Sequence, residues 1–257
     1  MVRLVGSEPD WERGVFPGLE GKAVGQRAGR TGQLVSRRQA LASAGGAAIV
    51  GAALGSASGA AADPAGTAAA LGSARVGETA TRLVGVIDQR SNKFVAYGFY
   101  TLIAGVRETE LFSALTDPVS ESNAHFTFHG TASLVQRTVV GDVFTLAVAG
   151  SLAHYYQRSP ASSFADPDSF ASGVKVGTSK FALQDVLIQL SSSSGLATLE
   201  GPVTQVGSRP FQFGGRMIQF GRAGLKTQLT ASGVGAAASL TPPVVRLSLS
   251  GTQVVAS

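Results

Sequence analysis

The sequence predicts an all-β protein whose main domain is a single antiparallel β-barrel, with a β-sandwich as the alternative. After residue 80, apolar residues recur at every second position in segments separated by Gly, Pro, Asp and Ser, a pattern typical of strands. No long stretch keeps the period of a helix. The strands are long, carry glycines and in places change their apolar face, which indicates strong curvature. Such curvature favours a closed barrel over a flat sandwich.

The period-two segments define eight expected strands. They cover residues 82–88, 93–103, 124–139, 142–157, 174–190, 211–221, 225–231 and 244–250. Residues 107–115 fit either a short strand or one helical turn. Residues 93–103 are apolar on both faces, which predicts a strand that is buried on both sides.

The clearest pair of strands is the hairpin over residues 124–157. Its apolar residues are even-numbered on both strands: Phe126, Phe128, Ala132 and Leu134, then Phe144, Leu146, Val148 and Leu152. Directly paired residues lie on the same side of a sheet, so even positions must meet even positions, which excludes a two-residue turn. We therefore expect a three-residue loop at 139–141 with Gly141 in the left-handed conformation. In this register Leu134 faces Leu146.

Two other segments change their apolar face midway. In both segments the apolar residues change from odd-numbered to even-numbered positions. In the first, Phe181 and Leu183 are followed by Val186 and Ile188. In the second, Phe211 and Phe213 are followed by Ile218 and Phe220. Each change predicts a β-bulge. We expect these bulges near residues 184–185 and at residues 214–215.

The segment before the β domain contains adjacent arginines in Ser36-Arg37-Arg38-Gln39-Ala40-Leu41, followed by a weakly apolar stretch without charge until Asp63. Ala60-Ala61-Ala62 offers an A-x-A cleavage site at its end. In these features the segment resembles a twin-arginine export signal, which implies a secreted or cell-envelope protein. A retained membrane anchor is the alternative, but frequent glycines interrupt the apolar stretch and weaken insertion.

These observations divide the chain into four parts. Residues 1–35 are expected to be a disordered or wrongly assigned N-terminal extension, and residues 36–62 the export signal. Residues 63–80 form a linker rich in Ala, Gly and Thr, and residues 81–257 form the antiparallel β domain.

Charge and cysteine content exclude several classes of function. The chain has 21 basic and 16 acidic residues, of which residues 1–62 hold seven and four, so the remainder carries 14 and 12 and a net charge of only +2. Its basic residues are scattered, so nucleic acid is not an expected partner, and membrane contact is expected only through the signal. The absence of cysteine excludes disulfides, thiolate metal sites and cysteine nucleophiles.

The titratable side chains show no complete catalytic or metal-binding pattern. His125 and His129 share a face but stand roughly 13 Å apart along a strand, too far to bind one metal, and His154 falls on the opposite face. Glu108 and Glu110 would lie ~7 Å apart on one strand face, within the range of glycosidase pairs, although a solvated charged edge is the better interpretation. The sequence therefore predicts no cofactor and no metal site, and it identifies no catalytic set.

Two classes of function follow, and the absence of a spaced acid–base set favours the first. The first is a barrel that binds a small apolar molecule, similar in general form to lipocalin-like or allene-oxide-cyclase-like barrels. Its pocket is expected to measure ~300 Å³ or more and to lie near Gly98, Gly130 and Gly150. The residues expected to line it are Tyr97, Phe99, Phe126, Phe128, Phe144 and Leu146.

The second class is an exported hydrolase or isomerase. Its site would lie in the barrel mouth, with Glu108, Glu110, Asp185 or His154 as acid or base. A structural envelope protein without a cavity is a further alternative, and the sequence makes no prediction of oligomeric state.

Overall fold

A computed structural model describes residues 69–72, 74–114, 119–191, 193–240 and 243–257. The expected N-terminal extension at 1–35 and the expected export signal at 36–62 lie outside the described residues. Within the described part, no helix has the length and apolar character needed to cross a membrane.

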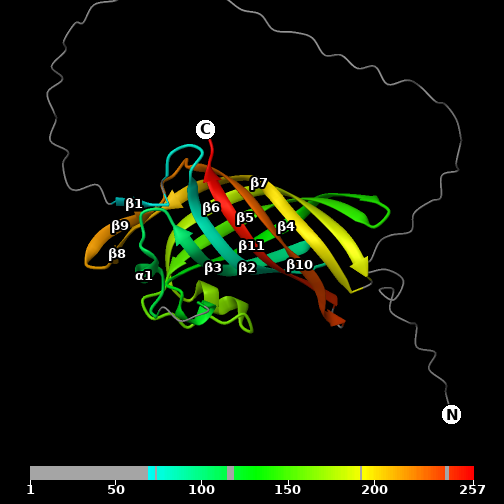
Figure 1. Cartoon of the computed structure of the whole chain (residues 1–257), viewed down its shortest axis with the longest axis horizontal. Coiled ribbons are helices and arrows are strands. Elements are labelled where there is room, and N and C mark those ends of the chain that lie inside the picture. Colours follow the sequence, from blue (N-terminus) through cyan, green and yellow to red (C-terminus); the bar gives the residue numbers. More distant parts are fainter. Residues whose placement is uncertain (1–68, 73, 115–118, 192, 241–242) are drawn as a thin grey trace, which may run out of the picture. The chain divides into compact units, whose positions relative to one another are not determined.

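Eight antiparallel strands form a closed barrel, as predicted (Figure 1). They are β2 (Thr79–Arg90), β3 (Lys93–Ile103), β4 (Phe126–Val140), β5 (Val143–Tyr156), β6 (Val174–Ser191), β7 (Ser194–Ser208), β10 (Lys226–Leu240) and β11 (Pro243–Val255). Each strand pairs with the next barrel strand in the chain, and β11 pairs with β2 to close the ring. Closure leaves the eight-stranded sheet of the barrel without a free edge.

The two ends of the barrel differ. At one end, here called the hairpin end, four tight hairpins are closed by the pairs Arg90↔Lys93, Val140↔Val143, Ser191↔Ser194 and Leu240↔Pro243. The opposite end, here called the loop end, carries the longer connections with α1 (Glu108–Leu111) and the 3₁₀ turns η2 (Glu121–Asn123) and η3 (Pro167–Ala171). A small sheet of β1 (Ala69–Leu71), β9 (Arg216–Phe220) and β8 (Pro210–Phe213) also lies there.

Three elements differ from the sequence-based expectation. Strand β7 was not predicted, because its inward positions include Ala197, Gly201 and Gln205, which weaken the apolar alternation. The expected strand at 211–221 is the hairpin β8–β9, whose turn places two consecutive glycines at 214–215 at positive φ. This turn accounts for the change of apolar face without a bulge. The segment predicted as a linker contributes β1 and the first residues of β2.

The hairpin β4–β5 has a different register from the predicted one. Its turn has two residues, and the glycine at its first position, Gly141, has a φ of +57°, as predicted and as expected for a type II′ turn. A bulge between Leu134 and Gln136 corrects the parity within the strand. Leu134 therefore pairs with Val148 and not with Leu146.

The predicted bulge near residues 184–185 is wrong. β6 keeps one register against β7 from Phe181↔Val203 to Gln189↔Gly195. The exposed fractions of Val186 and Ile188 are accordingly 39% and 43%, on the outer face of the barrel. Asp185 instead faces the interior and is 4% exposed.

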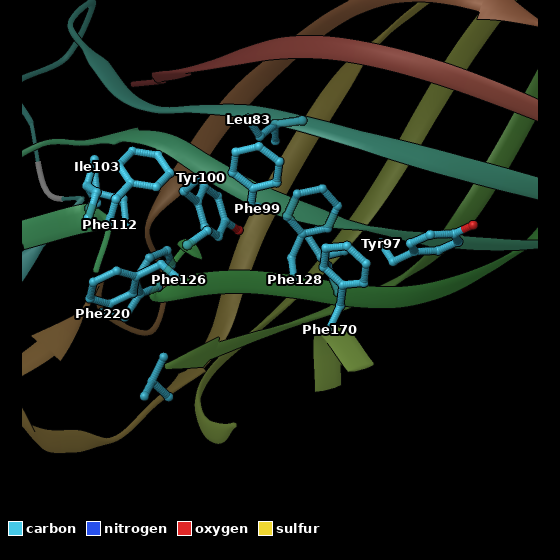
Figure 2. Close-up of a cluster of buried hydrophobic side chains, with 14 of the residues drawn as sticks. Leu83, Tyr97, Phe99, Tyr100, Ile103, Phe112, Phe126, Phe128, Phe170 and Phe220 are labelled. Atoms are coloured by element: carbon cyan, nitrogen blue, oxygen red, sulfur yellow. The ribbon is translucent and has the colours of Figure 1, made fainter. Parts of the chain in front are cut away.

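A largely aromatic core cluster lies toward the loop end, on both the inner and the outer face of the barrel wall, and a largely aliphatic cluster lies inside the barrel toward the hairpin end. β3 is covered on both faces, as its sequence predicts. Outside the barrel, Phe170 of η3 lies 5.4 Å from the ring of Tyr97, and the Phe170 carbonyl accepts a hydrogen bond from the Thr127 hydroxyl at 2.7 Å. Figure 2 shows this aromatic cluster, with the Tyr97 hydroxyl directed away from the other labelled rings.

Candidate ligand cavity inside the barrel

A cavity of about 80 Å³ lies inside the barrel, where the aromatic and aliphatic core clusters meet. All eight barrel strands contribute to its wall. The wall is almost wholly apolar and includes Phe128, Phe181 and several leucines. The two polar side chains in the wall are Asp185 of β6 and Gln253 of β11.

Asp185 is a solitary carboxyl group within the described part of the chain. Its strand neighbours are Leu146 on β5 and Leu199 on β7. Its Oδ1 atom is buried and makes no hydrogen bond to any described residue. Burial raises the pKa of this carboxyl to about 7, because the charged form is poorly solvated in an apolar wall.

Gln253 brings a second unsatisfied polar atom to the same wall. Its Oε1 accepts a hydrogen bond from the Thr81 hydroxyl at 3.1 Å. Its buried Nε2 has no partner among the described residues. Buried polar atoms in native proteins nearly always have partners. The unpaired Oδ1 of Asp185, in a residue of the main cavity wall, therefore indicates a place where a bound molecule supplies one.

A hydrogen-bonded chain of three side chains lies toward the loop end. His154 Nδ1 is 2.6 Å from the Tyr100 hydroxyl, and His154 Nε2 is 2.8 Å from the Ser179 hydroxyl. Phe220 stacks on the imidazole at 4.7 Å between ring centroids. Burial, with a smaller contribution from Lys175, lowers the pKa of His154 to about 3, so the ring is neutral at pH 7.

This chain adjoins a second, smaller cavity of about 20 Å³, which His154, Ser179 and Gln253 help to line. Its volume suits a single water molecule. An imidazole with a pKa of about 3 is a weak base, whereas an effective general base has a pKa near the working pH. The three hydrogen-bonded side chains are therefore better suited to ordering the core than to activating Ser179 as a nucleophile.

The six predicted ligand-binding residues do not form one surface. They lie in the cavity wall, in the rest of the aromatic cluster, in the aliphatic cluster and on the outer face of the barrel. Phe128 lines the cavity, while Phe126 belongs to the aromatic cluster and lies 5.3 Å from Phe213 of β8. Phe144 and Leu146 belong to the aliphatic cluster.

Tyr97 and Phe99 do not share this interior, which corrects the expectation of one common surface. Successive residues of a strand point to opposite faces, and the inward positions of β3 are those of Phe94 and Ala96, which line the cavity. Tyr97 and Phe99 pack outside the barrel against Phe164, at 6.1 and 6.3 Å between ring centroids. A role of the six residues in ligand binding stays a prediction.

The expected enlargement beside the glycines is not seen inside the barrel, although Gly150 contributes to a hollow of about 540 Å³ that exposed residues such as Thr131 and Lys180 also line. Gly98, Gly130 and Gly150 are absent from the cavity wall. The space beside each is taken by a neighbour, because an added Cβ would lie 2.7 Å from the Phe128 ring, from Leu152 Cδ1 and from Ala132 Cβ respectively. The cavity is accordingly much smaller than the expected ~300 Å³.

Of the four predicted acid–base candidates, only Asp185 lines the main cavity. Glu108 and Glu110 lie in the helical turn α1, where Glu110 pairs with Arg107 at 3.1 Å and Arg216 at 3.6 Å. In the sequence, the signal for Asp185 is its odd position in register with Phe181 and Leu183. The assumed bulge concealed that signal.

Among the described residues, no group of three or more His, Cys, Asp or Glu side chains is placed to bind a metal. Comparison of the chain with protein-family models, curated proteins and solved structures finds no match. A functional proposal therefore depends on the geometry of the cavity.

Proposed function

We propose that this protein is an exported β-barrel that binds a small apolar molecule in its internal cavity. The observation that carries the proposal is the almost wholly apolar wall that contains the carboxyl group of Asp185, whose buried Oδ1 has no partner in the described part of the chain. Ligand sites typically combine an apolar wall with a few polar groups that orient the ligand.

The volume of the cavity limits the size of the ligand. A core cavity of about 150 Å³ accommodates benzene, so about 80 Å³ takes a smaller molecule unless the wall adjusts. Leucines form much of this wall, including Leu83, Leu152, Leu199 and Leu229. Changes of their rotamers would widen the cavity for a ligand with five or six non-hydrogen atoms.

The proposal is tested by thermal unfolding of the full chain with small apolar molecules such as 2-methylbutane, cyclopentane and benzene. A ligand at about 100 times its dissociation constant stabilises the folded state by about 2.7 kcal/mol, so Tm should rise by several degrees. Ala231→Leu fills the cavity from β10 and should abolish the rise. Ala149→Leu, on an exposed position of β5, should retain it. An unchanged Tm with every ligand would refute binding.

Export is proposed from the twin-arginine pattern around Arg37 and Arg38. Replacing both arginines with lysine should abolish export, and mass spectrometry of the secreted protein should find a new N-terminus near Asp63. Secretion that persists in cells lacking the twin-arginine translocase would contradict the proposal.

An isomerase is a second candidate, favoured by the position of Asp185 in the cavity wall and by its pKa of about 7. A general acid–base group works best when its pKa lies near the working pH. Incubation of a bound ligand in D₂O separates the two functions. Deuterium that enters the ligand with the wild type but not with Asp185→Asn would establish acid–base catalysis. A ligand that stays unlabelled would show that the protein binds it without catalysis.

A further inference from the structure

We propose that the cavity selects molecules in which a protonated amine is attached to a small apolar body, with the Asp185 carboxylate as the counter-ion. This inference rests on the proposed binding function and specifies the class of ligand. Two observations support it, the absence of a partner for Asp185 Oδ1 among the described residues and the almost wholly apolar wall of the cavity.

The residues paired with Asp185 and those opposite it in the cavity wall carry no charge. β5 presents Leu146 and Val148, β7 presents Leu199, and β11 presents Leu247 across the cavity. The charged residue on the same inner face is Arg137 of β4, which pairs with Leu146, two strands away from Asp185. Its buried Nε has no partner among the described residues, and it does not contribute to the pKa of Asp185. No charged side chain of the described residues contributes to its pKa, which burial alone raises to about 7. In the empty protein the carboxyl therefore carries a proton for much of the time at neutral pH.

The sign of the charge discriminates among ligands. A carboxylate ligand would bring a second negative charge into the same apolar wall, which is strongly unfavourable. A neutral alcohol would gain one ordinary hydrogen bond. An ammonium group supplies an opposite charge and three N–H donors to a carboxylate whose Oδ1 lacks a partner among the described residues, and such charge-assisted hydrogen bonds are the stronger kind.

The remaining polar atom of the wall does not require a second polar group on the ligand. Gln253 also borders the smaller cavity, whose volume of about 20 Å³ suits one water molecule. A water there can accept the Gln253 Nε2–H bond. A ligand with a single amine and an otherwise apolar surface is thus complementary to the main cavity.

Binding of the amine is expected to depend on pH in a defined direction. The ammonium group requires the ionised form of Asp185, so binding displaces the proton that the carboxyl holds below pH 7. The apparent affinity is reduced by the fraction of protein in the binding-competent form. Between pH 8 and pH 5 that fraction falls by about 100-fold for a group with a pKa of about 7, whereas simple alkylamines stay protonated throughout.

The experiment compares three probes of similar shape by calorimetry and thermal unfolding of the full chain. Isobutylamine is the cation, 2-methylbutane its neutral counterpart and isobutyrate the anion. At pH 8 we expect isobutylamine to bind at least 10-fold more tightly than 2-methylbutane, and isobutyrate not to bind. Affinity for the amine should fall by about 100-fold at pH 5, while affinity for 2-methylbutane should not change.

Asp185→Asn should remove the preference for the amine and its pH dependence, while 2-methylbutane still binds. Asp142→Asn, at the exposed turn of β4–β5, is the matched control and should behave as the wild type. Equal affinity of the wild type for amine and alkane, or tighter binding of isobutyrate, would overturn the inference and leave the apolar site intact. Failure of all three probes to bind would overturn both the inference and the proposed function.

Discussion

Asp185 illustrates how a single side chain can be set apart by its surroundings. On an exposed strand it would be an ordinary solvated carboxylate. In the wall of the cavity, flanked by Leu146 and Leu199, it has neither a hydrogen-bond partner at Oδ1 nor a charged neighbour among the described residues. Native proteins seldom retain such a group unless it serves a function, because an unpaired buried charge costs stability.

This residue is expected to make stability depend on pH. The pKa of Asp185 is about 7 in the folded protein against an ordinary value of 3.8, so between pH 3.8 and pH 7 the folded state binds more protons than the unfolded state. The stabilisation of the folded state that depends on protonated Asp185 is therefore complete below pH 4 and is lost as pH rises through 7. The loss amounts to about 4 kcal/mol by linkage.

Asp185→Asn removes the titration. The stability of the variant relative to the wild type should therefore increase by about 3–4 kcal/mol between pH 4 and pH 8, measured by urea unfolding at several pH values. Asp142→Asn controls for the loss of a carboxylate at an exposed site. Parallel pH profiles for the wild type and Asp185→Asn would show that this carboxyl is solvated in the folded protein.

At the scale of elements, the hairpin β4–β5 shows how turns and bulges share the task of setting register. The two-residue turn at Gly141 alone would bring residues of opposite parity together. The bulge between Leu134 and Gln136 restores the pairing of the apolar positions deeper in the barrel. A sequence pattern records the net parity of the two strands but not whether the turn or a bulge supplies the correction.

Gly141→Val tests the turn. An added Cβ would meet no atom within 4 Å, so the φ of +57° is the only obstacle to a side chain. We expect the unfolding free energy to fall by about 1–2 kcal/mol, since β-branched residues resist positive φ. Gly141→Asn should cost less, because asparagine tolerates this conformation. An unchanged melting temperature for the valine variant would contradict this account of the turn.

At the scale of the whole molecule, the fold depends on closure between the first and last barrel strands. Arg246 of β11 donates two hydrogen bonds to Asp88 of β2, from Nε at 2.8 Å and from Nη2 at 2.9 Å. The Tyr97 hydroxyl donates a third to the same carboxylate at 2.9 Å. Burial raises the pKa of Asp88, but these hydrogen bonds and the Arg246 charge outweigh it, so the pKa lies below 3.8.

Arg246→Met should lower the free energy of unfolding by about 2 kcal/mol, because it leaves the largely buried carboxylate of Asp88 without its cation. The stabilisation from the lowered pKa of Asp88 is present above pH 3.8 and is lost as pH falls below it. The variant should therefore differ from the wild type at pH 7 and less so in strong acid, as measured by urea unfolding. Arg222→Met, at an exposed position, should have little effect, and equal losses for both variants would refute a role in closure.

Four features could be predicted from the residues alone: the all-β class, the barrel as the favoured architecture, the burial of β3 on both faces and the positive φ of Gly141. These follow from local chemistry, because period-two alternation and glycine conformation act within a few residues. Strand β7 was not predicted, because small and polar residues at its inward positions, such as Ala197 and Gln205, weaken the alternation of apolar and polar residues.

Which face of each strand points inward depends on contacts between strands that are distant in the chain. Alternation sorts residues into two sets, but closure of the ring selects the set that is enclosed. It placed Tyr97 and Phe99 outside, against Phe164, and turned Asp185 toward the cavity. The volume of that cavity depends on how Phe128 and its neighbours on other strands fill the space beside the glycines, which is a property of packing between segments distant in the chain.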